Sequence, residues 1–405
     1  MILNSPLRLI VYSFNTSSYI ISSVLEKPIY IEYTRRYSND DSAQISVVLT
    51  SQNAAALKKG CIVWIEGTTC MYVNDLHLTS DNKITAWGSL CDNFIGDRIL
   101  LNDLTFENTY ISSVFANIFQ NINNVPNMSF STQNIGSETY TGSFKKGSNA
   151  LDIIRELCTT FDLGYKTEKT NNQNSNALQL EFTVYKGADH TNDVIMSQKF
   201  GSISEFEYSF DIKDEISFVR VYGKDNTIVD VSSSGYTGIA KEYALDCTNI
   251  SSEGLTQQQY QAILTAKGQE YLQNHVSRET YTGLYTGKAF LYPENFNLGD
   301  VVKIQDDKRA FDTNQRVTQA LYQYSTNGKS LKLSFGEVQK TISSALSQLY
   351  KKVDKIENTP IEASSGGGGS VTLGYGLKYD SNGAICINFD PTINIENAII
   401  VQKVT

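Results

Sequence analysis

Hydrophobic and polar residues alternate over the first hundred positions in short runs that are separated by turns. β-Branched and aromatic side chains dominate these runs, and polar stretches such as residues 38–41 and 80–82 stand between them. Strands of this length and spacing are typical of a β-barrel or a β-sandwich. We therefore predict one β-domain over residues 1–100. Its strands are predicted at residues 28–33, 43–49, 61–66, 71–78 and 83–90.

The hydrophobic period becomes helical after residue 100. Apolar residues recur every three or four positions over residues 110–122, which predicts an amphipathic helix. A second helix is predicted after Asn149, whose side chain can cap it, and Gly164 stands where such a helix commonly ends. Together with two later strands, these helices predict an inserted α+β domain over residues 101–205. The strands are predicted at residues 178–185 and 194–200.

The strand pattern returns at residue 206 and continues to residue 336. Residues 206–212 alternate between apolar and polar side chains, and residues 216–222 continue that alternation. A helix over residues 256–275 interrupts the strands, and Thr256 with Gln259 fits a capping box at its start. A sheet broken by insertions explains this return, so we predict a second β-domain over residues 206–336. Its later strands are predicted at residues 283–292, 299–304, 316–324 and 331–335.

Residues 337–358 have the pattern of a long helix. Its apolar positions follow a heptad spacing for about three repeats, near the minimum for a coiled coil. β-Branched residues at both core positions favour three strands over two. The alternative is a helix that packs on its own domain. The predicted trimer contacts are Ile342, Leu346, Leu349, Val353 and Ile356.

The C-terminal end combines a flexible linker with a small β module. Residues 359–370 are rich in glycine and serine, a composition typical of a linker. Residues 371–405 contain short strand patterns around a turn at 380–383. So few residues cannot bury a core alone, so we expect this module to pack on its trimer mates or on a partner.

Composition narrows the class of protein. The 405 residues carry 34 Lys and Arg against 43 Asp and Glu, a formal charge of -9, and include 24 Tyr and 18 Phe. This chain is too aromatic for disorder and too acidic for a general nucleic-acid binder. No apolar run approaches the roughly 20 residues that a membrane span needs, and residues 1–6 do not begin a secretion signal. We expect a protein made in the cytoplasm, without stable membrane insertion.

Known catalytic and cofactor signatures are missing from the sequence. His77, His190 and His275 are the only histidines and lie far apart, which argues against a zinc site. The stretch 283–288 resembles a phosphate-binding loop but is one residue too short between its glycines. The six scattered cysteines favour buried thiols, with a disulfide framework as the alternative. We therefore predict no enzyme, no cofactor and no metal.

Three segments carry a resemblance to a known family. They are the end of the first β-domain at residues 87–92, the helix sequence at 147–157, and the strand start at 296–306. Strands at 316–319 and 331–336 follow the third segment in the family's order. In this layout the chain resembles the tail hub, or tail-associated, proteins of long-tailed phages of Gram-positive bacteria, which are related to the baseplate hub of contractile-tailed phages.

The resemblance implies a structural virion protein. Two tail-tube-like β-barrel ring domains per chain would form a homotrimeric ring at the distal end of the phage tail. The ring would dock on the distal tail protein and the tail tube, surround the tape-measure protein, and let DNA pass on infection without specific recognition. Residues 371–405 would attach receptor-binding proteins or fibres. An acidic lumen would repel the passing DNA.

Two other functions remain open. A receptor- or carbohydrate-binding tail protein would use exposed aromatic platforms, but Trp64 and Trp87 stand in apolar strands where we expect burial. A cell-wall glycosidase needs two positioned carboxylates, which no spacing identifies. Many members of the family carry a long C-terminal extension with a peptidase, lysozyme or carbohydrate-binding module. Residues 371–405 resemble a short fibre strand unit and no enzyme, so we expect any cell-wall cleavage to lie in another chain.

Overall fold

The computed structural model describes most of the chain. The described residues are 8–79, 81–170, 176–234, 236, 238–248, 250, 252, 256–336, 377–379 and 385–387. They belong to two units, Met1–Gln339 and Lys340–Thr405. In the second unit, β22 (Leu377–Tyr379) pairs antiparallel with β23 (Ile385–Ile387). These are two short strands, as the sequence predicts for this segment. The predicted helix over residues 337–358 and the linker lie outside the described residues.

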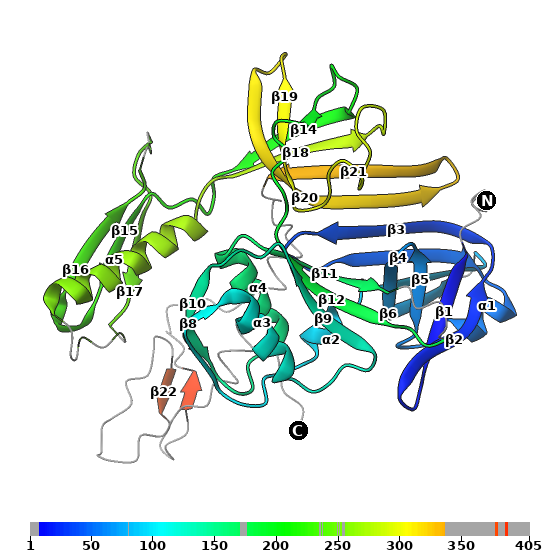
Figure 1. Ribbon diagram of the computed structural model, residues 1–405, viewed down its shortest axis with the longest axis horizontal. Helices are drawn as coiled ribbons and strands as arrows, with labels where there is room; N and C mark the ends of the chain where they lie inside the picture. Colours follow the sequence, from blue (N-terminus) through cyan, green and yellow to red (C-terminus); the bar gives the residue numbers. More distant parts are fainter. Residues whose placement is uncertain are drawn as a thin grey trace. The chain divides into compact units, whose positions relative to one another are not determined.

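One 13-stranded sheet runs through the first unit (Figure 1). Its N-terminal half comprises β1 (Leu9–Asn15), β2 (Ser18–Leu25), β3 (Pro28–Arg36), β4 (Ser42–Val48), β5 (Ile62–Glu66), β6 (Thr69–Thr79) and β7 (Lys83–Ser89). Its C-terminal half comprises β13 (Ile195–Met196), β14 (Ile203–Asp211), β18 (Arg278–Tyr285), β19 (Val301–Asp306), β20 (Phe311–Ser325) and β21 (Gly328–Gly336). The strands predicted at residues 28–90 and 299–335 are confirmed. The short helix α1 (Ser51–Ala56) was not predicted.

Antiparallel pairing of β3 with β20 joins the two halves. The register places Tyr322 opposite Tyr33 and Tyr324 opposite Ile31. The rings of Tyr33 and Tyr322 stack with their centroids 4.5 Å apart. Tyr324 is buried within the hydrophobic core of the N-terminal half, although it belongs to the other half of the sheet. Packing across this pair therefore makes the two halves one cooperative structure.

Neither half closes into a barrel within the described residues. The strand order begins at β14 and ends at β2, and each half continues into the other through β3 and β20. The mainly β class expected from the sequence is confirmed. The two separate barrels that were also expected are not found in the described residues, where the two halves form one continuous sheet. Among the helices of the described part, none has the length and apolar character to cross a bilayer.

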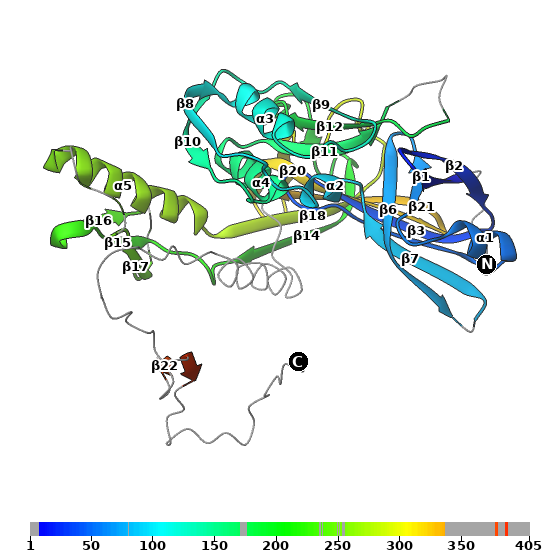
Figure 2. The same ribbon diagram turned by 90° about the horizontal axis from the view of Figure 1, so that it is seen from below.

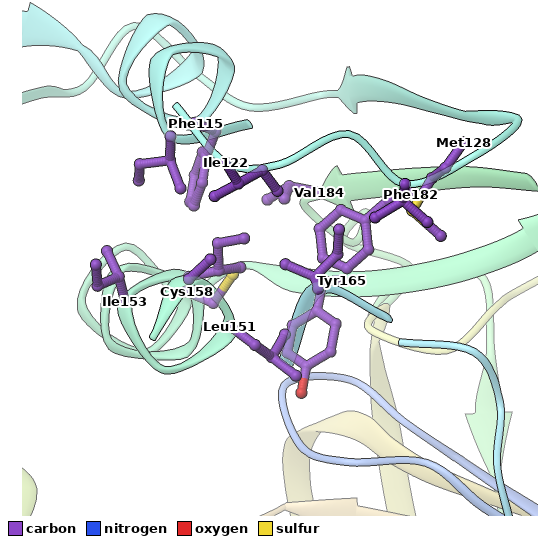
Figure 3. Packing of buried hydrophobic residues seen from close by; sticks show 14 of the residues in the cluster. Phe115, Ile122, Met128, Leu151, Ile153, Cys158, Tyr165, Phe182 and Val184 are labelled. Atoms are coloured by element: carbon purple, nitrogen blue, oxygen red, sulfur yellow. The ribbon is translucent and has the colours of Figure 1, made fainter. Parts of the chain in front are cut away.

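An α+β module lies between the two halves in sequence. It contains α2 (Asn93–Gly96), β8 (Leu104–Tyr110), α3 (Ile111–Gln120), β9 (Met128–Gln133), β10 (Thr139–Phe144), α4 (Ala150–Thr160), β11 (Gly164–Lys169) and β12 (Leu180–Tyr185). Helices α3 and α4 pack their apolar faces against the β11–β12–β9 sheet, and Phe115, Leu151, Tyr165 and Phe182 meet in the core (Figure 3). Both predicted helices are confirmed.

The prediction that Asn149 caps the start of α4 is confirmed, but the prediction that Gly164 ends this helix is wrong. The Asn149 side chain accepts a hydrogen bond from the Asp152 N–H at 3.1 Å. At the other end Asp162 takes the left-handed conformation, with φ of 53°, and Gly164 instead begins β11. A Cβ at Gly164 would overlap the buried ring of Tyr37, so close packing and not backbone freedom requires glycine there.

A second insertion separates β14 from β18. It consists of β15 (Phe218–Tyr222), β16 (Ile228–Ser232), β17 (Glu242–Asp246) and α5 (Gln257–Asn274), with α5 along one face of the small sheet (Figure 2). Val219, Val221 and Leu264 are buried between them. The predicted capping box of Thr256 and Gln259 is present. The strand predicted at residues 216–222 is confirmed as β15, but it starts this separate sheet, while β14 pairs directly with β18.

Replacing Gly164 with alanine tests the packing around Tyr37. The added methyl group must displace the Tyr37 ring, so the free energy of unfolding should fall by about 2–3 kcal/mol, as overpacking of a core does. Gly67→Ala is the control, because a Cβ there meets no atom within 4 Å and adds only left-handed backbone strain of about 1 kcal/mol. Denaturant unfolding measures both values, and equal losses would contradict the packing argument.

Candidate functional site

A cavity of about 660 Å³ lies where the two halves of the large sheet meet the sheet of the α+β module. Its walls come from β3, the β5–β6 turn, β9, β11, β12, β18, β20 and β21. These segments are far apart in sequence, so the cavity depends on the tertiary arrangement of three sheets. Its lining combines tyrosines, paired charges and neutral polar side chains.

Glu66 organises one wall of the cavity. The hydroxyl of Tyr33 donates to its Oε1 at 2.5 Å, the hydroxyl of Tyr324 donates to the same oxygen, and Lys329 Nζ lies 3.2 Å from it. Burial alone would raise the pKa of Glu66, but the hydrogen bonds from Tyr324 and Tyr33 and the charge of Lys329 outweigh it and lower that pKa. Burial and the charge of Glu66 raise the pKa of Tyr33, so its hydroxyl stays a donor.

A second polar cluster links β3 to β11. Arg35 forms an ion pair with Glu168 at 3.1 Å and donates to Thr69 Oγ1 at 2.8 Å. Glu168 also accepts from the Thr68 hydroxyl at 2.9 Å and pairs with Lys166 at 2.8 Å. Only 12% of the Arg35 side chain is exposed, so the pair is largely shielded from water and salt. The Arg35–Glu168 ion pair thus links the α+β module to the N-terminal half of the large sheet.

Asp300 lies on a third wall of the cavity. Its carboxylate accepts hydrogen bonds from the N–H groups of Ala188 and Asn297, both at 2.7 Å. His190 Nε2 lies 3.5 Å from the same carboxylate. At Gly187 a Cβ would collide with the backbone of Gly299, so the two loops approach more closely than any other residue type allows.

Asp92 is buried near Arg35 and Thr167, and its carboxylate has too few hydrogen-bond partners to stabilise a negative charge there. The residue is 1% exposed, and neither carboxylate oxygen makes a well-formed hydrogen bond within the described residues, nor does the neighbouring hydroxyl of Thr167. Burial raises the pKa of Asp92 to about 7, although the hydroxyl of Thr167 and the charge of Arg35 act in the opposite direction. Burial, followed by the charge of Asp92, also raises the pKa of Asp41.

The residues considered for chemistry do not converge. His77 lies on the surface 3.3 Å from Asp75, and the Nδ1 atom of His275 lies 2.8 Å from the carbonyl of Tyr271. No group of three potential ligands that could hold a metal occurs in the part of the chain that is described. The cysteines at 61, 70, 91, 158 and 247 are buried, as expected for core thiols.

The expected burial of the two tryptophans is met only in part, and the expected trimer contacts are not tested. Trp64 and Trp87 lie in strands, as predicted, but both are half-buried and not fully covered. Lys169 Nζ lies 4.9 Å from the centroid of the Trp64 ring. The predicted trimer contacts lie outside the described residues and stay a prediction. They are Ile342, Leu346, Leu349, Val353 and Ile356.

Sequence reasoning missed the cavity because its residues come from remote segments. The available signal was the mixture of aromatic and charged side chains on one strand, where Tyr33 and Arg35 stand two positions apart and therefore point to the same face. Such a pattern identifies a strand face but not the segments that cover it.

The fold is that of phage tail proteins. The 43 kDa tail protein of prophage MuSo2 from Shewanella oneidensis matches with a TM-score of 0.55 and 12% identity, over 81% of this chain and 97% of that one. A tail protein from Neisseria meningitidis has the same TM-score and identity, over 82% and 97%. Prophage tail protein gp18 from Listeria monocytogenes has a TM-score of 0.52 and 15% identity, over 86% and 99%.

A comparison of the sequence with models of protein families identifies the family of this chain. Residues 11–337 match the model of the Siphovirus ReqiPepy6 Gp37-like proteins, and the chain belongs to that family. A search among curated proteins gives no match. The resemblance to phage tail-associated proteins is thereby confirmed.

Replacing Asp92 with asparagine should remove a pH-dependent cost. Because the pKa of Asp92 is higher in the folded chain than in the unfolded chain, its contribution to stability is complete at low pH and is lost as the pH rises from about 4 to about 7. Asp92→Asn should match the wild type near pH 4 and exceed it by about 4 kcal/mol near pH 8. Urea unfolding across this range measures the difference.

The control is Asp97→Asn, which removes an exposed carboxylate close by. Because this side chain stays in contact with water in the folded chain, its replacement should not reproduce the pH-dependent gain of Asp92→Asn. A constant difference for Asp92→Asn would show that the Asp92 carboxylate is not destabilised by burial.

Proposed function

We propose that this protein is the structural hub of a phage tail, a non-enzymatic protein that forms a homotrimeric ring at the distal end of the tail tube. Each chain contributes two β halves, so three copies place six β units around a lumen, and each half serves as one tail-tube-like ring domain. The ring closes the tube, binds the distal tail protein and surrounds the tape-measure protein. DNA passes through its lumen on infection.

The observation that carries the proposal is the junction of two β halves in one sheet through β3 and β20. Six register pairs, from Gln319–Arg36 to Tyr324–Ile31, fix the halves relative to each other. A rigid pair of β units suits a symmetric ring, because each interface in such a ring repeats the same geometry. The likeness in fold to phage tail proteins, over nearly their whole length, supports the same role.

The two ends of the large sheet differ in a way that supports assembly. The outer edge of β2 is partly covered, since the Ile21 N–H donates to the carbonyl of Asn176 at 3.2 Å. The outer edge of β14 has no strand partner among the described strands, and Phe210 on β14 is 61% exposed. An uncovered strand edge with an exposed aromatic ring is a surface that another chain can extend.

The remaining parts of the chain have roles in the same assembly. The predicted helix over residues 337–358 holds three chains together, and residues 371–405 attach receptor-binding proteins or fibres. The formal charge of -9 supports an acidic lumen that repels DNA. Assembly takes place in the host cytoplasm, and the finished protein resides at the tail tip of the virion.

The trimer predicts a specific mass. Three chains of 45.1 kDa give about 135 kDa by light scattering, and negative-stain images of the same peak should show a ring with an open centre. A chain that stays monomeric both alone and with its distal tail protein would contradict the hub.

Leu349→Asp tests the helix directly. A carboxylate at a core position of a three-stranded coiled coil is buried without a partner, so the trimer should dissociate at least about tenfold more readily. Ser347→Asp, which adds the same charge away from the predicted stripe, is the matched control. An intact trimer in the Leu349 variant would assign trimer formation to other surfaces.

A further inference from the structure

We propose that the cavity between the three sheets binds a neutral saccharide. Its volume of about 660 Å³ falls within the roughly 300–1,000 Å³ typical of small-molecule sites. The inference concerns this cavity alone and holds for the single chain as well as for the trimer.

Aromatic surface is the first property that points to a sugar. Five tyrosines from β3, β12, β18, β20 and the loop after β18 line the cavity: Tyr33, Tyr185, Tyr285, Tyr292 and Tyr322. The rings of Tyr33 and Tyr322 are stacked, that of Tyr292 lies 6.4 Å from Tyr322, and that of Tyr285 lies 6.5 Å from Tyr292, so four of the five rings form a continuous group. The hydroxyls of Tyr33 and Tyr285 already donate to Glu66 and to the carbonyl of Phe290, so the tyrosines contribute chiefly apolar ring surface for the C–H groups of a sugar.

Balanced charge is the second property, and it excludes ionic ligands. Of the cations in the lining, Arg35 and Lys166 pair with Glu168, and Lys329 pairs with Glu66. The fourth, Lys186, pairs at 3.2 Å with Glu138. An anion would have to compete with these carboxylates for its partners.

The carboxylates of the lining are equally occupied. Glu66 accepts from two tyrosine hydroxyls, Glu168 from Thr68, and Asp300 from two backbone N–H groups. A cation would therefore find no carboxylate without a partner in the described lining. A purely apolar ligand is excluded too, because it would strip water from these charged groups without replacing its hydrogen bonds.

Neutral polar groups complete the lining and match the hydroxyls of a sugar. Gln133 and Asn134 at the end of β9, Asn297 and Ser330 line the wall and carry an amide or a hydroxyl. Amides and hydroxyls both donate and accept, as sugar hydroxyls do, so they can bind the ligand without a change in net charge. A polyhydroxylated neutral molecule is the class that satisfies all three properties.

Saturation-transfer NMR on the full chain tests the proposal. The probes are N-acetylglucosamine, galactose and rhamnose, with glucosamine and glucuronic acid as charged counterparts. At least one neutral sugar should receive saturation, and the charged counterparts should bind about tenfold more weakly or not at all, because each brings an uncompensated charge into the cavity. Absence of transfer to every neutral sugar overturns the proposal, as does equal binding of the charged ones.

Variants locate the binding. Tyr292→Ala removes a ring from the cavity wall and should weaken the neutral sugar about tenfold or more. Tyr110→Ala removes a 59% exposed tyrosine that does not line the cavity, and should leave binding unchanged. Gln133→Ala, at an exposed position of the rim, provides the same test if the Tyr292 variant does not fold. Wild-type binding in whichever of these cavity variants is folded would place the sugar elsewhere and overturn the assignment.

Discussion

The pairing of β3 with β20 is the interaction on which the rest of the structure depends. These strands are separated by almost three hundred residues in sequence, yet they make the two halves one sheet and place Tyr324 in the core of the opposite half. Bringing such distant segments together costs chain entropy before any contact forms. The tyrosine stack, the ladder hydrogen bonds and the buried Tyr324 together offset that cost.

Tyr37 extends the same junction to the α+β module. It follows β3 directly, and its ring occupies space that only glycine leaves free at positions 164 and 299. Its hydroxyl donates to the carbonyl of Asp162 at 3.1 Å, and its own carbonyl accepts from the Tyr165 N–H at 2.9 Å. One tyrosine thus contacts both the α+β module and the C-terminal half, whose segments form walls of the cavity.

A junction of this kind suits a protein that acts by shape. The polar clusters around Glu66, Glu168 and Asp300 are internally satisfied, so they orient the modules with little need for solvent or ions. Asp92 is the exception, because its burial without adequate partners destabilises the junction as the pH rises. Such a group is retained at a cost in stability at neutral pH.

Local elements followed from the sequence by itself, whereas their assembly did not. Alternating side chains identified many of the strands, although not β1, β2 or β8–β10. The 3.6-residue period identified α3 and α4, and Asn149 and Thr256 marked helix starts, because these features depend on neighbours within a few residues. The family could also be recognised from three ordered segments. Only the tertiary structure decided that β3 pairs with β20, that β15 leaves the main sheet, and that Gly164 serves packing instead of a helix end. Those outcomes depend on contacts between residues far apart in the chain, and a periodic pattern shows which face of a strand is buried but not which segment covers it.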